Sequence, residues 1–456
     1  MALDTTSNQP APTGHPRGLY VLAATEMWER FSFYGMSALL TLYVSKELLL
    51  PANASQVWGL AGLRGVFDAV GPASDLALAV KIYGWYAGLV YFTPILGGWI
   101  ADRLLGARRT VLIGVLLMSA GHLLMTFYAS FLLALAMLIL GSGCLKGNIS
   151  AQVGALYPRG AESLRTRGYT IFSTGINIGA ATGPLATGAV AAAYGWHAGF
   201  ALAGVLMLVA LVTYLLGQHL LPDDRPRRTA AEPRAPLTQA ERRRVTFLLA
   251  VVALVIPAEI AYPMIWNLGP AWLDHWVDLS TPLGTVPAAW FASADSTGSI
   301  ISAALLVPFW AWQARRGKEP GEIGKIGIGT LIVAVALLLL VWGNLGHSAP
   351  SSVAVGWPLA AWLIMGLGWM YYWPTLLALI SRCAPPSIAS TLMGLAFMAP
   401  FIGHTLTGYI AAWYETMSPS AFWLLDAGIA LAGGLVVLAL RHRLARGIDP
   451  ALQGQD

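Results

Sequence analysis

Charged side chains are scarce in this sequence. Only 11% of its 456 residues are Asp, Glu, Lys or Arg, whereas soluble domains carry about 25%. Hydrophobic residues make up 57% of the chain, and a soluble fold could not bury that much apolar surface. The scarcity of charge therefore excludes an ordinary soluble domain and indicates a chain that crosses a bilayer many times.

Chemistry-bearing clusters are missing as well. The two cysteines, Cys144 and Cys383, both lie in apolar segments, where no disulfide is expected and no metal-ligand spacing exists. No nucleophile has a base at helical spacing, and no glycine loop is built to bind phosphate. The net charge of +5 is dispersed rather than gathered on an aromatic, basic face. The absence of these clusters argues against a bound metal, against a membrane enzyme or receptor, and against a nucleic-acid partner.

What the sequence does contain is long apolar segments. A helix needs about 20 apolar residues to cross the hydrocarbon core, and this template predicts twelve spans. The expected spans are Leu19–Lys46, Leu78–Ile100, Val111–Ala129, Leu132–Leu156, Gly168–Tyr194, Ala198–Leu221, Val245–Leu273, Trp290–Trp312, Ile326–Asn344, Val355–Ile380, Ile388–Tyr414 and Ala421–Leu440. A mildly apolar loop between the first two spans is expected to contain a short interfacial helix.

Basic residues give the spans an orientation, because Lys and Arg prefer cytoplasmic loops. Of the 27 Lys and Arg residues, all but five fall on one side when the amino terminus is placed inside. The exceptions are Lys46, Arg64 and Lys81 outside, with Arg30 and Lys146 inside spans. We therefore expect an all-α, multi-pass protein of the cell inner (plasma) membrane with both termini cytoplasmic. The predicted parts are a tail (1–17), a six-helix bundle (18–221), a linker (222–244), a second six-helix bundle (245–440) and a tail (441–456).

Ionisable residues within the first span are the strongest functional signal. A charge at the centre of a bilayer costs a few kcal/mol and normally survives when it is paired or faces a wet cavity. Glu26, Arg30 and Tyr34 follow one another at four-residue spacing, which puts them on one helical face, and Glu29 adjoins them. Snorkelling of Arg30 to the interface is the structural alternative, but Arg30 lies about 20 Å along the helix from Arg17.

A second buried cation lies in the fourth span. Lys146 occurs among small residues that allow close helix approach, and it requires a carboxylate partner, for which Glu26 and Glu29 are the candidates. A purely structural ion pair between the two helices is the alternative interpretation. Protonation of a Glu in such a cluster would release its partner and bias one conformation over another, so we expect these four residues to couple transport to protons.

The second half offers weaker candidates. Pro257 and Pro263 bracket Glu259, which indicates a broken or bent helix, and broken helices often mark transport sites. Asp295 lies within a span, as do His122, His404 and Asp426. A lone His in a span is more often a packed residue than a proton carrier.

Two motifs resemble known families. The segment between the second and third spans resembles the loop signature of the major facilitator superfamily through Gly98, Asp102, Arg103, Gly106, Arg108 and Arg109. The segment Glu26–Gly35 is similar to the first-helix signature of the proton-dependent oligopeptide transporter family, and Gly168–Leu185 is similar to its fifth-helix signature. The resemblance covers nearly the whole first half and is thinner in the second.

The resemblance implies a proton symporter for di- or tripeptides that rocks one bundle against the other around a central site. It implies no cofactor, since the proton gradient drives transport. Glu26, Glu29, Arg30 and Lys146 would couple protons, and Arg30 and Lys146 would help to hold the substrate carboxylate. Tyr34, Tyr91 and Asn177 would line the peptide pocket.

The departures from the family pattern affect the substrate. The tenth helix of the family usually carries a Glu that receives the peptide amino group, and Trp369 stands there in this chain. Asp295 replaces the usual eighth-helix Asn. Trp369 puts an aromatic wall in place of the charge of that Glu, and with Tyr371, Tyr372 and Trp373 it would favour a bulky, aromatic or amino-blocked substrate.

We therefore expect a proton-coupled importer of di-/tripeptides or peptide-like compounds, with Glu259, Asp295 and Trp369 also in the binding site. One alternative is a carrier of a bulky, modified or amino-blocked peptide-like natural product. Another is an exporter of drugs or metabolites. The partners expected are the small-molecule substrate, protons and the lipid bilayer, and the sequence leaves the oligomeric state open.

Overall fold

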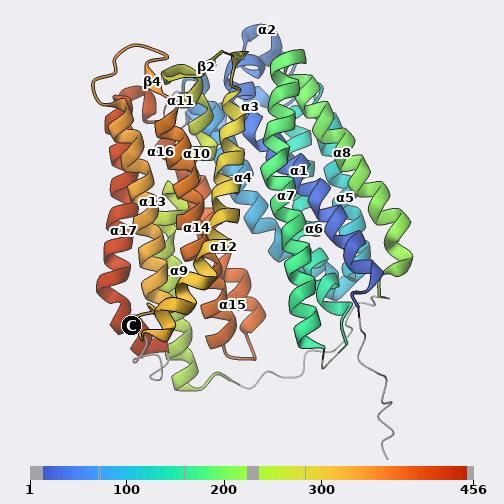
Figure 1. Cartoon of the computed structure of the whole chain (residues 1–456). Helices are drawn as coiled ribbons and strands as arrows, with labels where there is room; N and C mark the ends of the chain where they lie inside the picture. The colour runs from blue at the N-terminus through green and yellow to red at the C-terminus, as the bar shows by residue number, and fades with distance from the viewer. Residues whose placement is uncertain are drawn as a thin grey trace, which may run out of the picture.

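The computed structural model of the chain describes residues 14–69, 71, 73–158, 161–222, 236–282 and 284–448. Its first half consists of long helices with short connections (Figure 1). They are α1 (Arg17–Tyr43), α2 (Pro51–Ala54), α3 (Leu60–Asp68), α4 (Asp75–Ile100), α5 (Ala107–Leu124), α6 (Phe131–Ala155), α7 (Glu162–Tyr194) and α8 (Trp196–Gly217), with helical turns at Val44–Leu48, Ala101–Leu105 and Gln218–Leu220. The short helices α2 and α3 occupy the loop where an interfacial helix was expected.

The second half repeats this pattern with more interruptions. Its helices are α9 (Gln239–Ala261), α10 (Met264–Asn267), α11 (Gly269–Trp276), α12 (Phe291–Arg315), α13 (Glu322–Asn344), α14 (Gly356–Cys383), α15 (Ala389–Ala396), α16 (Met398–Ala411) and α17 (Pro419–Ile448), with turns at Ala288–Trp290 and Tyr414–Thr416. Short strands lie at the loop end: β1 (Val277–Asp278) pairs in parallel with β4 (Val353–Ala354), and β2 (Ser280–Thr281) pairs antiparallel with β3 (Gly284–Thr285).

Eleven helical segments are long and apolar enough to cross a membrane in the part of the chain that the structure describes. The remaining predicted span, the first along the chain, is α1. It is a helix of 27 residues and is therefore about 40 Å long. Its apolar character is diluted by Glu26, Glu29 and Arg30, all of which are buried inside the protein. The fold is thus all-helical with two six-helix bundles, as predicted.

The broken helix predicted around Glu259 is present. Helix α9 contains Pro257 and ends at Ala261, and two short helices, α10 and α11, complete the span. A proline within a helix removes one backbone hydrogen bond and clashes with the preceding turn, and Pro263 stands at the first break. Tyr262 and Trp266, on either side of Pro263, both donate hydrogen bonds to Asp295 of the neighbouring helix α12.

Two helices extend beyond the boundaries drawn from the sequence. Helix α9 begins at Gln239, inside the predicted linker, because Thr238 and Glu241 form a capping box at its start. Helix α17 continues through Ile448 into the predicted tail, because polar helical turns that project from a bilayer are stabilised by water and need no apolar residues. Residues 223–235 of the predicted linker, 1–13 of the first tail and 449–456 of the last lie outside the described residues.

Glycines bring the helices of the first bundle into close contact. A side chain at Gly97 on α4 would come within 2.0 Å of the Gly143 carbonyl oxygen on α6. A side chain at Gly179 on α7 would come within 2.3 Å of the Met27 carbonyl oxygen on α1. Small residues at such positions allow backbones to touch in a membrane, where van der Waals packing drives association. The sequence GSGCLKGN around Lys146 therefore lies against α4, as its small residues indicated.

The two bundles are joined at one end of the molecule. Lys46 forms an ion pair with Asp274 of α11, and Ser74 donates a hydrogen bond to Glu415. Two backbone carbonyls of the first bundle accept hydrogen bonds from the second, with Asn267 Nδ2 3.1 Å from Val80 O and Trp290 Nε1 2.9 Å from Leu185 O.

Toward the opposite end the bundles diverge (Figure 1). Helix α4 shows the change along its length, because Tyr86 is 2% exposed whereas Trp99, near its other end, is 55% exposed. The end that carries the helix starts of α1 and α9 also carries the end of α17, where Arg244 Nε donates to the Ile448 carbonyl. The structure therefore represents a conformation closed at the end with the strands and separated at the other.

Candidate functional site

The first-span charges form a compact ion-pair cluster in the interior of the first bundle. Arg30 Nε lies 3.0 Å from Glu26 Oε1 and 2.5 Å from Glu29 Oε2. The three residues are at most 5% exposed, so water contributes little to solvating them. Removing one partner from a buried pair strands a charge and costs about 3–5 kcal/mol. The buried charges of Glu26 and Glu29 are therefore stabilised by Arg30, and the charge of Arg30 is stabilised by them.

Lys146 approaches this cluster from α6, but it makes no direct ion pair within 4 Å among the described residues. Its ammonium lies 4.7 Å from the Phe33 ring centroid and 5.1 Å from the Tyr91 ring centroid. Glu26 and Glu29 are still close enough to interact with it electrostatically. The expected direct partner is thus absent, because Arg30 occupies the near oxygens of both carboxylates and two aromatic faces stabilise the ammonium instead.

The predicted pocket residues lie around these charges and reach the second bundle. Tyr34 contacts Trp266 of α10 with ring centroids 5.4 Å apart, and Tyr91 stacks on His404 of α16 at 5.1 Å. Asn177 lies on α7 and is partly buried. The two tyrosines therefore form the contact between the charge cluster and the opposite bundle, and His404 is a packed residue at this contact.

The second bundle contributes acids to the same region. Asp295 on α12 is 2% exposed, and its Oδ2 accepts hydrogen bonds from Tyr262 Oη at 2.7 Å and from Trp266 Nε1 at 3.0 Å. Its Oδ1 is buried without a hydrogen-bond partner within the described part of the chain. A carboxylate with one oxygen fixed and the other unused is poised to accept a further donor.

Glu259 lies on α9 next to α14 and α16. It is 4% exposed and interacts with the Tyr372 hydroxyl. A side chain at Gly403 would come within 2.4 Å of Glu259 Cβ, so the carboxylate stands where α16 passes closest to α9. The structure thus places both acids of the second half deep within its bundle.

The aromatic residues of α14 do not form a single wall. Tyr371 packs edge-on against Trp310 at 5.2 Å and Trp373 against Phe397 at 5.6 Å, whereas Tyr372 lies 6.5 Å from Tyr262. Trp369 is partly buried against the core. Successive residues of a helix point about 100° apart, so these four aromatics, spread over Trp369–Trp373, do not all share one face.

The loop motif forms the connection between α4 and α5. After the turn Ala101–Leu105, Gly106 adopts φ 80°, which favours glycine because it has no Cβ. Asp102, Arg103 and Arg109 are exposed at the separated end of the molecule. The carbonyl of Arg108 accepts a hydrogen bond from Tyr214 of α8 at 3.1 Å, and Gly98 lies in the last turn of α4.

The sequence analysis missed Tyr262, Trp266 and Phe33 as site residues. Tyr262 and Trp266 are four residues apart, which on a regular helix predicts a shared face, and they flank Pro263; this spacing was the available signal. Phe33 adjoins Tyr34 and contacts both Lys146 and Arg30. No group of three or more His, Cys, Asp or Glu residues able to hold a metal occurs among the described residues.

Comparisons with known proteins agree with this arrangement. A family model described as Major Facilitator Superfamily matches residues 30–408. A di-/tripeptide transporter of Lactococcus lactis subsp. lactis (strain IL1403) is 27% identical over 504 residues, covering 95% of this chain and 96% of that protein. The peptide transporter YePEPT of Yersinia enterocolitica subsp. palearctica is 26% identical, covering 96% of this chain and 97% of that protein.

Solved structures show the same similarity in three dimensions. The crystal structure of a peptide transporter, POT, in complex with sulfate matches with a TM-score of 0.78 and 25% identity over 96% of this chain and 97% of that chain. A mutant of a peptide transporter POT in complex with alafosfalin matches with a TM-score of 0.77 and 26% identity over 97% of each chain.

Proposed function

The chain belongs to the major facilitator superfamily, and from this premise we propose that it is a proton-coupled symporter that imports di-/tripeptides or peptide-like compounds. Its relatives are transporters, and the chain is a multi-pass membrane transporter rather than an enzyme. The observation that carries the proposal is the buried cluster of Glu26, Glu29 and Arg30 with Lys146 beside it.

Charge balance explains how this cluster couples protons to a substrate. With Glu26 and Glu29 ionised and Arg30 and Lys146 charged, the cluster is neutral. A substrate carboxylate that binds the two cations adds one negative charge, and a buried excess charge is costly. Protonation of one Glu restores neutrality. Substrate and proton therefore favour each other's binding, which is the requirement for symport.

Competition between the substrate carboxylate and the two Glu side chains for Arg30 links substrate binding to a structural change. The near oxygens of both carboxylates lie within 3.0 Å of one guanidinium nitrogen, so a substrate carboxylate that binds Arg30 competes with them for the same positive charge. A protonated Glu releases Arg30 at low cost, whereas an ionised Glu does not. Arg30 and Tyr34 then act on the same bound substrate, and the Tyr34–Trp266 contact transmits the change to the second bundle.

The acids of the second bundle complete a site for a zwitterion. Asp295 has one oxygen held by Tyr262 and Trp266 and the other unused. A substrate with its carboxylate at Arg30 and Lys146 would direct its ammonium group toward this bundle. Asp295, assisted by Glu259, would take the role of the family's tenth-helix Glu, because Trp369 occupies that position on α14 in this chain. Asn177 and Tyr91 would line the peptide backbone between the two ends.

The proposal includes the remaining expectations about environment. The transporter lies in the cell inner membrane, uses the proton gradient in place of a cofactor, and has protons, lipid and a peptide or peptide-like compound as its partners. The comparisons do not favour an exporter of drugs or metabolites, since the relatives reported above are named for peptides.

Transport by purified protein in proteoliposomes tests the function. An inward proton gradient should drive accumulation of a labelled dipeptide, and collapse of the gradient with a protonophore should abolish it. A panel of free and N-acetylated dipeptides as competitors identifies the substrate class. Competition by acetylated compounds alone would contradict the zwitterion site and favour an amino-blocked substrate, and outward transport under an inward gradient would favour the exporter.

A further inference from the structure

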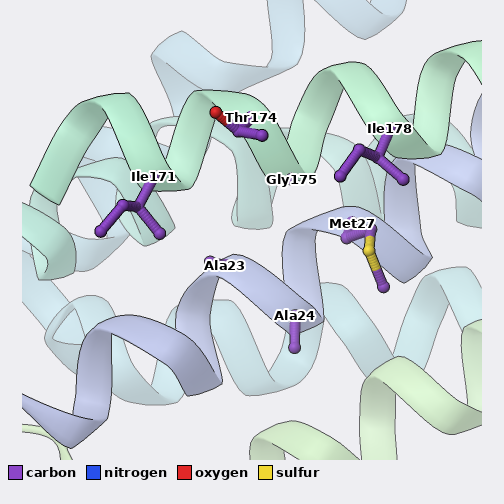
Figure 2. A pocket seen from close by; sticks show the side chains of 7 residues that line it. All are labelled: Ala23, Ala24, Met27, Ile171, Thr174, Gly175 and Ile178. Carbon is purple, nitrogen blue, oxygen red and sulfur yellow. The ribbon is translucent and has the colours of Figure 1, made fainter.

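A narrow apolar groove runs between α1 and α7, outside the central site. Its volume is about 340 Å³, and it is lined by Ala23, Ala24, Met27, Ile171, Thr174, Gly175 and Ile178. Figure 2 shows these side chains along both helices, with no charged group among them. Gly175 forms the floor, because it lacks a side chain where α7 passes closest to Ala23.

The groove faces away from the charge cluster. Ala24 and Glu26 are two residues apart on α1 and therefore point about 200° apart around the helix. Glu26 faces Arg30 in the interior, so Ala24 faces outward. The same outward face carries Tyr20, which is 55% exposed, and across the groove Ile178 of α7 is 47% exposed. In a membrane-spanning segment, an exposed apolar face is covered by lipid.

Two arginines, one on each helix, lie beyond the groove toward the separated end of the molecule. Arg17 and Ala24 are seven residues apart, as are Arg167 and Thr174, and this spacing returns each pair to one helical face about 10 Å apart. Both arginines are exposed, and neither forms an ion pair within 4 Å among the described residues. The polar region of a bilayer leaflet is about 5–8 Å thick, so long Arg side chains at this height reach lipid phosphates.

We propose that this groove binds an anionic phospholipid of the leaflet at the separated end of the molecule, with one acyl chain between α1 and α7 and the headgroup phosphate at Arg17 and Arg167. The positive charges of the two arginines match an anionic headgroup, and the apolar lining of the groove matches an acyl chain. Both helices of the groove also carry residues of the proposed substrate site, so the lipid would bridge two helices of that site.

Native mass spectrometry of the purified full-length protein tests the proposal. The protein is titrated with phosphatidylglycerol or phosphatidylcholine of identical acyl chains. Phosphatidylglycerol should bind more tightly. Each basic residue near a membrane surface contributes about 1 kcal/mol, or about fivefold, so Arg17→Gln with Arg167→Gln should weaken phosphatidylglycerol binding by roughly 25-fold. The control is Arg443→Gln with Arg446→Gln, two exposed arginines on α17, which should leave binding unchanged.

A groove-filling variant tests the acyl-chain half of the site. Ala24→Phe should weaken binding of both lipids, whereas Ala192→Phe, at an exposed position elsewhere on α7, should weaken neither. Inorganic phosphate at millimolar concentration should not displace the lipid. Equal affinity for the two lipids, an unaffected double arginine variant, or full phosphatidylglycerol binding by a folded Ala24→Phe protein would each overturn the proposal.

Discussion

The first bundle buries acids beside bases, whereas the second buries acids alone. Among the described residues, the buried Lys and Arg side chains are Arg30 and Lys81, both in the first bundle. The second bundle buries Glu259, Asp295 and Asp426, and Asp295 accepts hydrogen bonds from a Tyr and a Trp. In the proposed site, the bundles therefore contribute opposite ends, with cations on one side and carboxylates on the other.

The two bundles also differ in how they treat a buried charge. In the first, both carboxylates of the cluster share Arg30 as their ionic partner, so protonation changes the ion pairing. In the second, neutral Tyr and Trp groups hold Asp295, so a cation must come from outside the protein. This difference underlies the proposed division, in which the first bundle couples protons and the second recognises the ammonium group. The four predictions below test that division.

The largest effect is expected for Glu29→Gln. This side chain is fully buried, and its carboxylate lies 2.5 Å from Arg30 Nε. A neutral amide cannot change charge, so proton-driven accumulation should fall on the order of 100-fold, the upper range of coupling free energies. Counterflow exchange in proteoliposomes, which needs no net proton movement, should be less affected.

Glu26→Gln should give the same pattern, and Glu162→Gln, at an exposed position on α7, provides the control. An equal loss of accumulation and counterflow in the Glu29 and Glu26 variants would assign these carboxylates a structural role.

Removal of the second cation should have a smaller effect on the same coupling. Lys146 interacts with Glu26 and Glu29 without a direct ion pair, so Lys146→Ala should lower accumulation on the order of 30-fold and spare counterflow. The measurement is uptake at matched inward proton gradients, with Lys318→Ala, an exposed lysine, as control. Intact coupling in Lys146→Ala would remove Lys146 from the proposed cluster.

Substitution in the second bundle should change recognition rather than coupling. Asp295→Asn keeps an oxygen for Tyr262 but loses the negative charge. A hydrogen bond to a charged group contributes about 1.5–3 kcal/mol, so KM for free-amino dipeptides should rise roughly 10- to 100-fold, while competition by N-acetylated dipeptides should not weaken. Uptake kinetics with both substrates measure the split.

The control for this variant is Asp278→Asn, at an exposed acid in β1. A loss of proton coupling in Asp295→Asn with unchanged KM would reverse the division of roles between the bundles.

The smallest effect is expected where the bundles meet. Lys46 and Asp274 form an ion pair across them, but both side chains are at least 36% exposed, and exposed pairs contribute about 0.2–1 kcal/mol. Lys46→Gln should therefore increase the population open at this end by no more than about fivefold. Spin-label distances between α1 and α11 measure the populations.

A charge swap provides the matched control at this position. Lys46→Asp with Asp274→Lys should restore the wild-type distance distribution. If Lys46→Gln and the swap behave alike, the pair does not contribute to closure.

Much of the fold could be predicted because the bilayer imposes simple rules. A span must be apolar and about 20 residues long, so segment length and composition predicted the twelve spans, and charge asymmetry supported their pairing. The break in the seventh span was predicted from Pro257 and Pro263. These rules do not apply to helix ends outside the bilayer, and α9 and α17 therefore extend beyond the predicted boundaries.

The site was only partly predictable. Glu26, Glu29 and Arg30 could be grouped from their spacing, since they lie on one helix. The position of Lys146 depends on a different helix, and the sequence could not show that two aromatic rings, rather than a carboxylate, would contact its ammonium. The different partners of the α14 aromatics depend on the rotation of that helix, which the sequence does not show.

By itself, the sequence determined that this chain crosses a membrane through two helix bundles and that charges lie within the first span, because the cost of polar groups in hydrocarbon leaves few other arrangements. Tertiary structure alone decided which groups meet. Arg30 binds two carboxylates, Lys146 lies over aromatic rings, and Asp295 is held by donors from a broken helix. These contacts depend on helix rotation and crossing, which close packing of glycines sets and which a one-dimensional pattern does not contain.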